Sequence, residues 1–213
     1  MNRRLESRLF WGFHSPLSSL CAAPLIIMAS SRFSFALVCT GALIWVYGLT
    51  TLIFSYARPI LPNRGKIALL LFLSSFLSGF FMLLCGLLNP MLILGMGFFL
   101  ILIPPSCLGS GFFEASETAY PLEAASRAVL EAVVLGTIIM AVSLIREPLG
   151  MGTLSFPGGP EGIMELFSDG GTDSIALLRI LSVSSGGLLL FGYIIALFRY
   201  FKESSGSYPE AVE

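Results

Sequence analysis

Charged residues are scarce in this chain of 213 residues, at only 12% of the total. Soluble domains carry about 25% charged residues. Here hydrophobic residues reach 55% and the mean hydropathy is +0.87. Apolar runs of about 20 residues recur, which is the length of helix that crosses the ~30 Å hydrocarbon layer of a bilayer. The composition therefore excludes a soluble globular protein and predicts an all-α integral membrane protein with one membrane domain, residues 1–213.

Histidine is almost absent, because His14 is the only one in the chain. A serine–histidine–acid catalytic set is therefore implausible. The glycine-rich stretches lack the strand–turn–helix setting and the lysine of a phosphate-binding loop, which excludes nucleotide binding of that kind. We expect no catalytic residue in this chain. His14 lies close to Pro16 at the expected membrane border, and we interpret it as an interfacial residue rather than a ligand.

A cleavage site of small residues is also lacking after the first apolar stretch, which we interpret as a retained span rather than a signal peptide. Six apolar segments are expected, at residues 17–30, 33–56, 67–88, 91–105, 129–145 and 175–198. The first and fourth are too short for the bilayer at 1.5 Å per residue. Prolines mark the ends of three longer segments. Pro59 follows the second segment, Pro90 follows the third, and Pro148 is expected to close the fifth. Residues 109–128 should form a cytoplasmic or interfacial loop with a helical start, and residues 149–174 an exposed irregular loop.

The two halves of the chain form a weak internal repeat. Cys21 lies in the first short segment and Cys107 just after the second one. Each is followed by an arginine near a proline, Arg58 after 37 residues and Arg146 after 39. The expected divisions are 1–88 for the first repeat, 89–203 for the second and 204–213 for a polar tail. Because three segments is an odd number, the two halves must be inverted relative to each other. Such 3+3 inverted repeats place discontinuous helices and working groups near the membrane midplane.

Positive charge orients the chain in the membrane. It gathers at both termini and after the second segment, at Arg3, Arg4, Arg8, Arg58, Arg64, Lys66, Arg199 and Lys202. The positive-inside rule then places both termini in the cytoplasm. Arg32 and the acidic loop 149–174 are expected on the opposite side.

The four cysteines lie in or beside apolar segments, which argues against a secreted disulfide framework. Cys39 and Cys85 fall in the middle of helices and are expected to be small core residues. From spacing alone, Cys21 and Cys107 are open to the same interpretation or to a role as metal ligands. Two thiolates cannot complete a four-thiolate iron–sulfur site, so such a centre would need two ligands from another chain.

Polar and small residues inside the apolar segments allow further predictions. We expect Glu131 and Arg179 to snorkel to the interface, with an ion path as the alternative. Arg146 and Glu147 are expected to form an interfacial pair at the end of the fifth helix. Six glycines fit close helix packing, namely Gly79, Gly86, Gly136, Gly186, Gly187 and Gly192.

Three runs carry a resemblance to a known family. The first is His14-Ser-Pro16-Leu, followed by Ser-Leu20-Cys21-Ala-Ala-Pro24. The second is Pro105-Ser106-Cys107 with Gly111, Glu114 and Ala115 after it. The third and most specific is Ile145-Arg-Glu-Pro-Leu-Gly-Met-Gly-Thr-Leu154. In these runs the chain resembles the paired membrane subunits shared by the sodium-translocating NADH:quinone oxidoreductase (Nqr subunits D and E) and the Rnf complex (subunits A and E), and it is most similar to Nqr D and Rnf E.

The resemblance implies six helices in a 3+3 inverted repeat, with half-helices at the cysteines. It also implies a homologous partner of opposite topology in a bacterial cytoplasmic (inner) membrane. Cys21 and Cys107 then hold the iron of a [2Fe-2S] cluster, with two further cysteines from the partner. Compared with the family pattern, the proline after Cys21 is displaced to Pro24, Pro105-Ser106 replaces Thr-Asn, and Phe112 replaces an arginine.

On this resemblance the chain would be one subunit of a redox-driven translocase and would catalyse nothing by itself. Flavin- and iron-carrying subunits and the bilayer would be its partners, with no nucleic acid. The sequence leaves open ferredoxin:NAD or NADH:quinone chemistry, and Na⁺ or H⁺ as the coupling ion. An alternative is the substrate-binding membrane subunit of a vitamin or small-molecule importer, and a third is a structural subunit that has lost the cluster.

Overall fold

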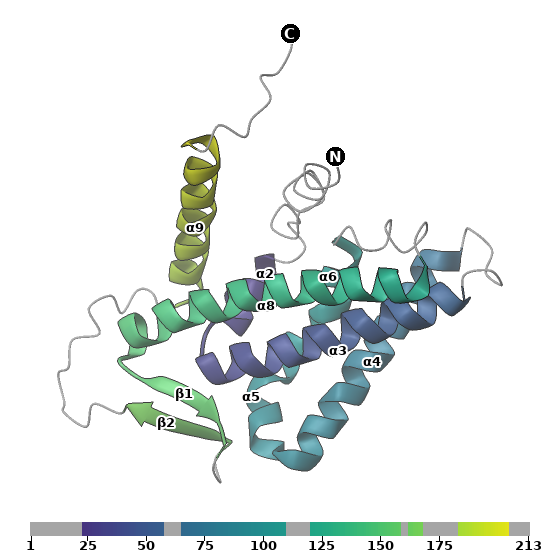
Figure 1. Ribbon diagram of the computed structural model, residues 1–213. Helices are drawn as coiled ribbons and strands as arrows, with labels where there is room; N and C mark the ends of the chain where they lie inside the picture. Colours follow the sequence, from purple (N-terminus) through teal and green to yellow (C-terminus); the bar gives the residue numbers. More distant parts are fainter. Residues whose placement is uncertain (1–22, 58–64, 110–119, 159–161, 168–182, 205–213) are drawn as a thin grey trace.

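The computed structural model describes residues 23–57, 65–109, 120–158, 162–167 and 183–204. These residues form helices and one β-hairpin (Figure 1). In chain order the elements are α2 (Ala23–Ala29), α3 (Phe33–Ala57), α4 (Lys66–Leu88), α5 (Pro90–Ile101), α6 (Ile103–Gly109), α8 (Pro121–Met151), β1 (Leu154–Pro157), β2 (Ile163–Phe167) and α9 (Ser184–Ser204).

Several helices have the length and composition of membrane spans. In the described part of the chain there are four such stretches, Phe33–Ala57, Lys66–Leu88, Pro90–Cys107 and Pro121–Met151. The chain therefore has the architecture of a multi-pass helical membrane protein. Residues 17–22 of the first expected segment lie outside the described residues, and so does the start of the sixth. The six-span inverted repeat consequently stays a prediction.

Helices α3 and α8 form the central antiparallel pair (Figure 1). The first residue of α3, Phe33, contacts Glu147 near the end of α8. Further along α3, Thr40 contacts Gly136 and Gly48 faces Val129. The residue numbers rise along one helix as they fall along the other, so the two helices run in opposite directions over most of their length.

Small side chains allow α3 and α8 to approach closely. Thr40 Oγ1 donates to the carbonyl oxygen of Ala36 at 2.7 Å and lies 3.3 Å from that of Gly136. A Cβ atom on Gly136 would collide with the Thr40 methyl group. The predicted packing role of Gly136 is therefore confirmed. At Gly79, Gly86 and Gly192 a Cβ would meet nothing within 4 Å, so within the described chain the packing prediction is wrong for those three.

The fourth expected segment is a broken helix, and the expectation that it is too short for the bilayer is wrong, because Pro90–Cys107 is long enough to span it. Asn89 has an extended backbone (φ −153°, ψ 93°), and its side chain caps α5 by accepting from the Leu92 N–H at 3.5 Å. Helix α5 ends at Ile101, and Leu102 separates it from α6. Pro104 lies in the first turn of α6, where its missing N–H has no intrahelical partner to lose. The break places Cys107 on a separate seven-residue helix.

Helix α8 is longer than the sequence predicted. It begins at Pro121 and so includes part of the loop expected at 109–128. It also continues to Met151, and Pro148 lies inside its last turns rather than closing it. Gly152 ends the helix in the left-handed conformation (φ 69°), with its N–H donating to the Pro148 carbonyl at 3.0 Å. A proline this near a helix end disturbs one turn only, which explains why the helix tolerates it.

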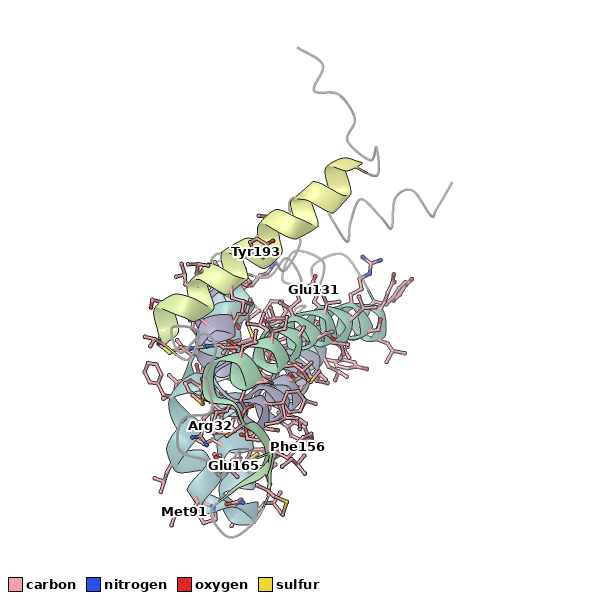
Figure 2. All side chains as sticks on the ribbon, turned by 90° about the vertical axis from the view of Figure 1, so that its left-hand side faces the viewer. Arg32, Met91, Glu131, Phe156, Glu165 and Tyr193 are labelled. Atoms are coloured by element: carbon pink, nitrogen blue, oxygen red, sulfur yellow. The ribbon has the colours of Figure 1, made fainter. Side chains whose placement is uncertain are left out.

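The expected irregular loop 149–174 contains the antiparallel hairpin β1–β2. The Phe156 ring packs edge-on against Phe33 at a centroid distance of 5.2 Å, and Figure 2 shows Arg32 beside Glu165, with an N–O separation of 3.9 Å. At the hairpin turn, Gly162 (φ 82°) lies so close to α5 that a Cβ would be 2.7 Å from the Leu92 nitrogen. The hairpin thus bridges the N-terminal ends of α3 and α5.

Candidate functional site

Cys107 lies in a small polar cluster within the apolar core, which we call the thiol cluster: Tyr47, Ser106 and Cys107. All three side chains are buried, and that of Cys107 is 0% exposed. The Tyr47 hydroxyl lies 3.1 Å from Ser106 Oγ, which donates to the Ile103 carbonyl at 2.7 Å. The Tyr47 side chain also hydrogen-bonds the Cys107 thiol. Helix α3 therefore positions the α6 thiol from across the core.

The chemistry of the thiol cluster suits a thiolate ligand. Cysteine sulfur is the usual protein ligand of iron–sulfur clusters, and a hydroxyl that donates to such a sulfur holds and tunes it. Cys39 and Cys85 differ from Cys107, because they lie inside the regular helices α3 and α4. Cys39 is a buried core residue as expected, whereas Cys85 is only half-buried and lies outside the core. Cys21, the second predicted ligand, lies outside the described residues, as do His14 and Arg179.

A metal centre at Cys107 would need ligands from elsewhere. Within the described ranges there is no group of three or more histidine, cysteine, aspartate or glutamate side chains that could hold a metal ion. The predicted site draws one thiol from Cys21 and two from a partner subunit, so the described residues contain only one of its ligands.

Arg146 joins three helices from the end of α8. Its side chain is only 2% exposed, and its guanidinium donates to the Ile27 carbonyl at 2.7 Å and to the Val183 carbonyl at 3.1 Å. Ser30 Oγ is a third partner at 3.2 Å. The guanidinium also lies against Gly187, where a Cβ would be 2.9 Å from Nη1. A positive charge at the C-terminal end of α2 is favourable, because the free carbonyl groups there carry partial negative charge.

Glu147, a negatively charged residue, contacts the start of the next helix, α3. Its side chain is 1% exposed, and Oε2 accepts from the Phe33 N–H at 2.6 Å. This N–H is one of the donors that a helix start leaves without an intrahelical partner. The Ser34 N–H next to it donates to Ser155 Oγ on β1 at 3.4 Å. Helix α8 and the hairpin together cap α3.

The prediction of an interfacial Arg146–Glu147 pair is therefore wrong. Both side chains are buried, and they bind different elements: Arg146 caps the end of α2 and Glu147 caps the start of α3. The short connection at residues 30–32 lies between these two caps. Consecutive residues on a helix point in directions about 100° apart, so one dipeptide serves both helix ends. Within the most specific run of the sequence, Ile145–Leu154, these two buried side chains therefore hold the ends of two helices together.

Glu131 occupies a different part of α8, on the side away from the hairpin (Figure 2). Its side chain is half-buried, and Oε2 is covered without a hydrogen-bond partner among the described residues. Snorkelling would place both oxygens in water, so only part of the carboxylate follows that expectation.

The sequence did not single out Tyr47, Ser30 or Ser155 as site residues. Tyr47 shares one buried face of α3 with Thr40 and Thr51, and polar residues recurring on one face of an apolar helix were an available signal. Ser155 had no such signal, because its partner Ser34 is 121 residues away in the chain.

The comparisons with known proteins add no relative. The chain matches no protein-family model and no curated protein. The class of protein that the fold supports is a multi-pass helical membrane protein with a buried thiol at a broken helix.

Proposed function

We propose that the chain is an integral membrane subunit of an ion-translocating electron-transport complex of the Rnf or Nqr type. In this proposal Cys21 and Cys107 hold one side of a [2Fe-2S] cluster, and a homologous partner of opposite topology supplies the other two thiolates. When bound, the cluster would accept and release one electron at a time within the membrane, coupled to Na⁺ or H⁺ transport. Both termini would lie in the cytoplasm.

The observation that carries this proposal is the placement of Cys107. The thiol lies on the short helix α6 that follows the break at Leu102, buried from solvent and hydrogen-bonded to Tyr47. Discontinuous helices at membrane depth mark binding positions, because irregular backbone is tolerated there only where protein covers it. Burial also shapes the reduction potential of an iron–sulfur cluster.

Each residue of the thiol cluster has a defined task in this proposal. Cys107 supplies the thiolate, and Tyr47 fixes its orientation with a hydroxyl donor. Ser106 donates its own proton to the Ile103 carbonyl, so the single Tyr47 proton is shared between Ser106 Oγ and the sulfur, which ties the Tyr47 hydroxyl to the first turn of α6. The surrounding apolar side chains exclude water from the sulfur.

The test is low-temperature EPR on the dithionite-reduced complex purified through this chain. We expect a two-iron signal in the wild type that is lost in both Cys21→Ala and Cys107→Ala. Cys39→Ala and Cys85→Ala are matched controls, because they remove buried or half-buried thiols from the same bundle and should keep the signal. A wild-type complex without the signal, or ligand variants that retain it, would overturn the ligand assignment and favour a transporter or structural role.

A further inference from the structure

Two buried oxygen atoms on α8 lack partners. Glu147 Oε1 and Ser143 Oγ are both enclosed by protein, and neither has a hydrogen-bond partner among the described residues. The other Glu147 oxygen already accepts from the Phe33 N–H at 2.6 Å. A buried carboxylate oxygen with no donor is costly, so a missing ligand at this position would stabilise the fold.

The two atoms lie on one face of the helix. Residues four apart are neighbours along a helix face, so Ser143 and Glu147 share the buried face of α8, without a hydrogen bond between them. Pro148 has no N–H, which leaves the Leu144 carbonyl of the same turn without its helical donor. The buried face of this turn of α8 therefore carries a carboxylate oxygen and a hydroxyl oxygen without partners, while Leu144 belongs to the exposed face beside it. Ser34 and Ser155, both fully buried, cover the adjoining start of α3.

These oxygens are the ligand types that hard cations prefer. The site has one carboxylate, and the guanidinium of Arg146 follows in the neighbouring position along the helix. A divalent ion would place two more positive charges beside a single negative one, whereas a monovalent ion matches the carboxylate. We propose that Ser143 and Glu147 bind a small monovalent cation between α8 and the start of α3, for which sodium is the probe. The site bears on the ion-coupled part of the proposed function, but its binding test needs neither iron nor electron transfer.

The test is the thermal unfolding of the detergent-purified complex, followed by tryptophan fluorescence, during titration with NaCl. Choline chloride keeps the ionic strength constant, because choline is too large for a buried one-turn site. A ligand that binds only the folded state raises the unfolding temperature in a saturable way. We expect this rise with NaCl in the wild type.

Two variants locate the ion. Glu147→Gln keeps an oxygen for the Phe33 N–H but removes the charge, so the response to sodium should disappear. Ser143→Ala leaves the α3 cap intact and should raise the half-saturating NaCl concentration about tenfold, the effect of losing about 1.4 kcal/mol of binding. Glu123→Gln and Ser126→Ala, on the exposed side of the same helix, should respond as the wild type does.

Three results would overturn the proposal. The first is equal unfolding temperatures in NaCl and choline chloride, which would mean that an ordered water fills the position. The second is a wild-type sodium response in Ser143→Ala, which decides the matter even if Glu147→Gln does not fold. The third is stabilisation by lower pH without any response to sodium, which would make the site a proton site. Because none of these readouts involves iron, they are independent of the EPR test of the proposed function.

Discussion

At the scale of single residues, the packing of the helices depends on charged side chains at buried positions, where apolar side chains are usual. Charged residues inside a membrane protein are costly unless they are paired or hydrogen-bonded. Arg146 meets this condition through carbonyl and hydroxyl acceptors on α2 and before α9. Its removal leaves those acceptors buried and without their donor.

We therefore predict that Arg146→Met lowers the free energy of unfolding by about 2 kcal/mol or more, the cost of leaving buried acceptors unsatisfied. Arg127→Met is the matched control on the same helix. Arg127 pairs with Glu123 at 2.8 Å on an exposed surface, and such pairs contribute about 1 kcal/mol or less. Denaturant titration of both variants in the same detergent checks the difference. Equal destabilisation would mean that Arg146 does not hold the helices together.

Tyr47 gives a second prediction at this scale, which rests on the iron–sulfur proposal. A hydroxyl that donates to a ligating sulfur stabilises the reduced, more negative cluster. Tyr47→Phe keeps the ring and removes the donor, so the midpoint potential should become more negative while the iron content stays the same. An EPR-monitored redox titration measures this shift. An unchanged potential in a fully loaded variant would show that the hydroxyl does not act on the cluster.

The sequence predicted part of the site and missed the rest for a physical reason. Helix period and proline positions indicated that Arg146 and Glu147 end a helix, and this led to an interfacial interpretation. Their partners Ile27 and Phe33 are 119 and 114 residues away. Burial of a charge is decided by such distant contacts, and local patterns carry no information about them.

At the scale of elements, apolar run length predicted most helices well. Helices α3 and α4 match their expected bounds to within one residue at each end. The misses occur where packing outweighs composition. Helix α8 extends beyond its apolar run into a more polar first turn that begins at Pro121. In the hairpin, the buried side chain of β1 is Ser155 rather than an apolar residue, so apolar alternation could not reveal the strand.

The crossing of α3 and α8 gives the prediction for this scale. Gly136→Ala would push a Cβ into Thr40 and should destabilise the protein by about 1–3 kcal/mol, the usual cost of overpacking. Gly79→Ala is the control, because nothing lies within 4 Å of its Cβ position. Alanine is the better helix former by about 1 kcal/mol, so this variant should be neutral or more stable. If Gly136→Ala behaves like Gly79→Ala, the crossing is not closely packed.

At the scale of the whole molecule, the antiparallel pair fixes which ends share a side. The start of α3, the end of α8 and the hairpin lie together at one end of the bundle, and the start of α8 lies at the other (Figure 1). The end of α3 and the start of α8 share one side of the bundle, and the positively charged residues Arg58, Arg64 and Lys66 follow α3. The positive-inside rule then predicts that this side faces the cytoplasm and that the hairpin faces outward.

Cysteine labelling tests this orientation. Met164 on β2 and Tyr120 before α8 are both exposed. In spheroplasts, a membrane-impermeant maleimide should label Met164→Cys directly and Tyr120→Cys only after permeabilisation. The wild-type chain controls for its own cysteines. The reverse pattern of labelling would invert the topology and exclude cytoplasmic termini.

The most direct test of the central claim is the iron content of the purified complex. Cys107→Ala should contain two iron atoms fewer per complex than Cys39→Ala, because loss of one ligand releases the whole [2Fe-2S] cluster. The same iron content in both variants would contradict an iron–sulfur role for this chain.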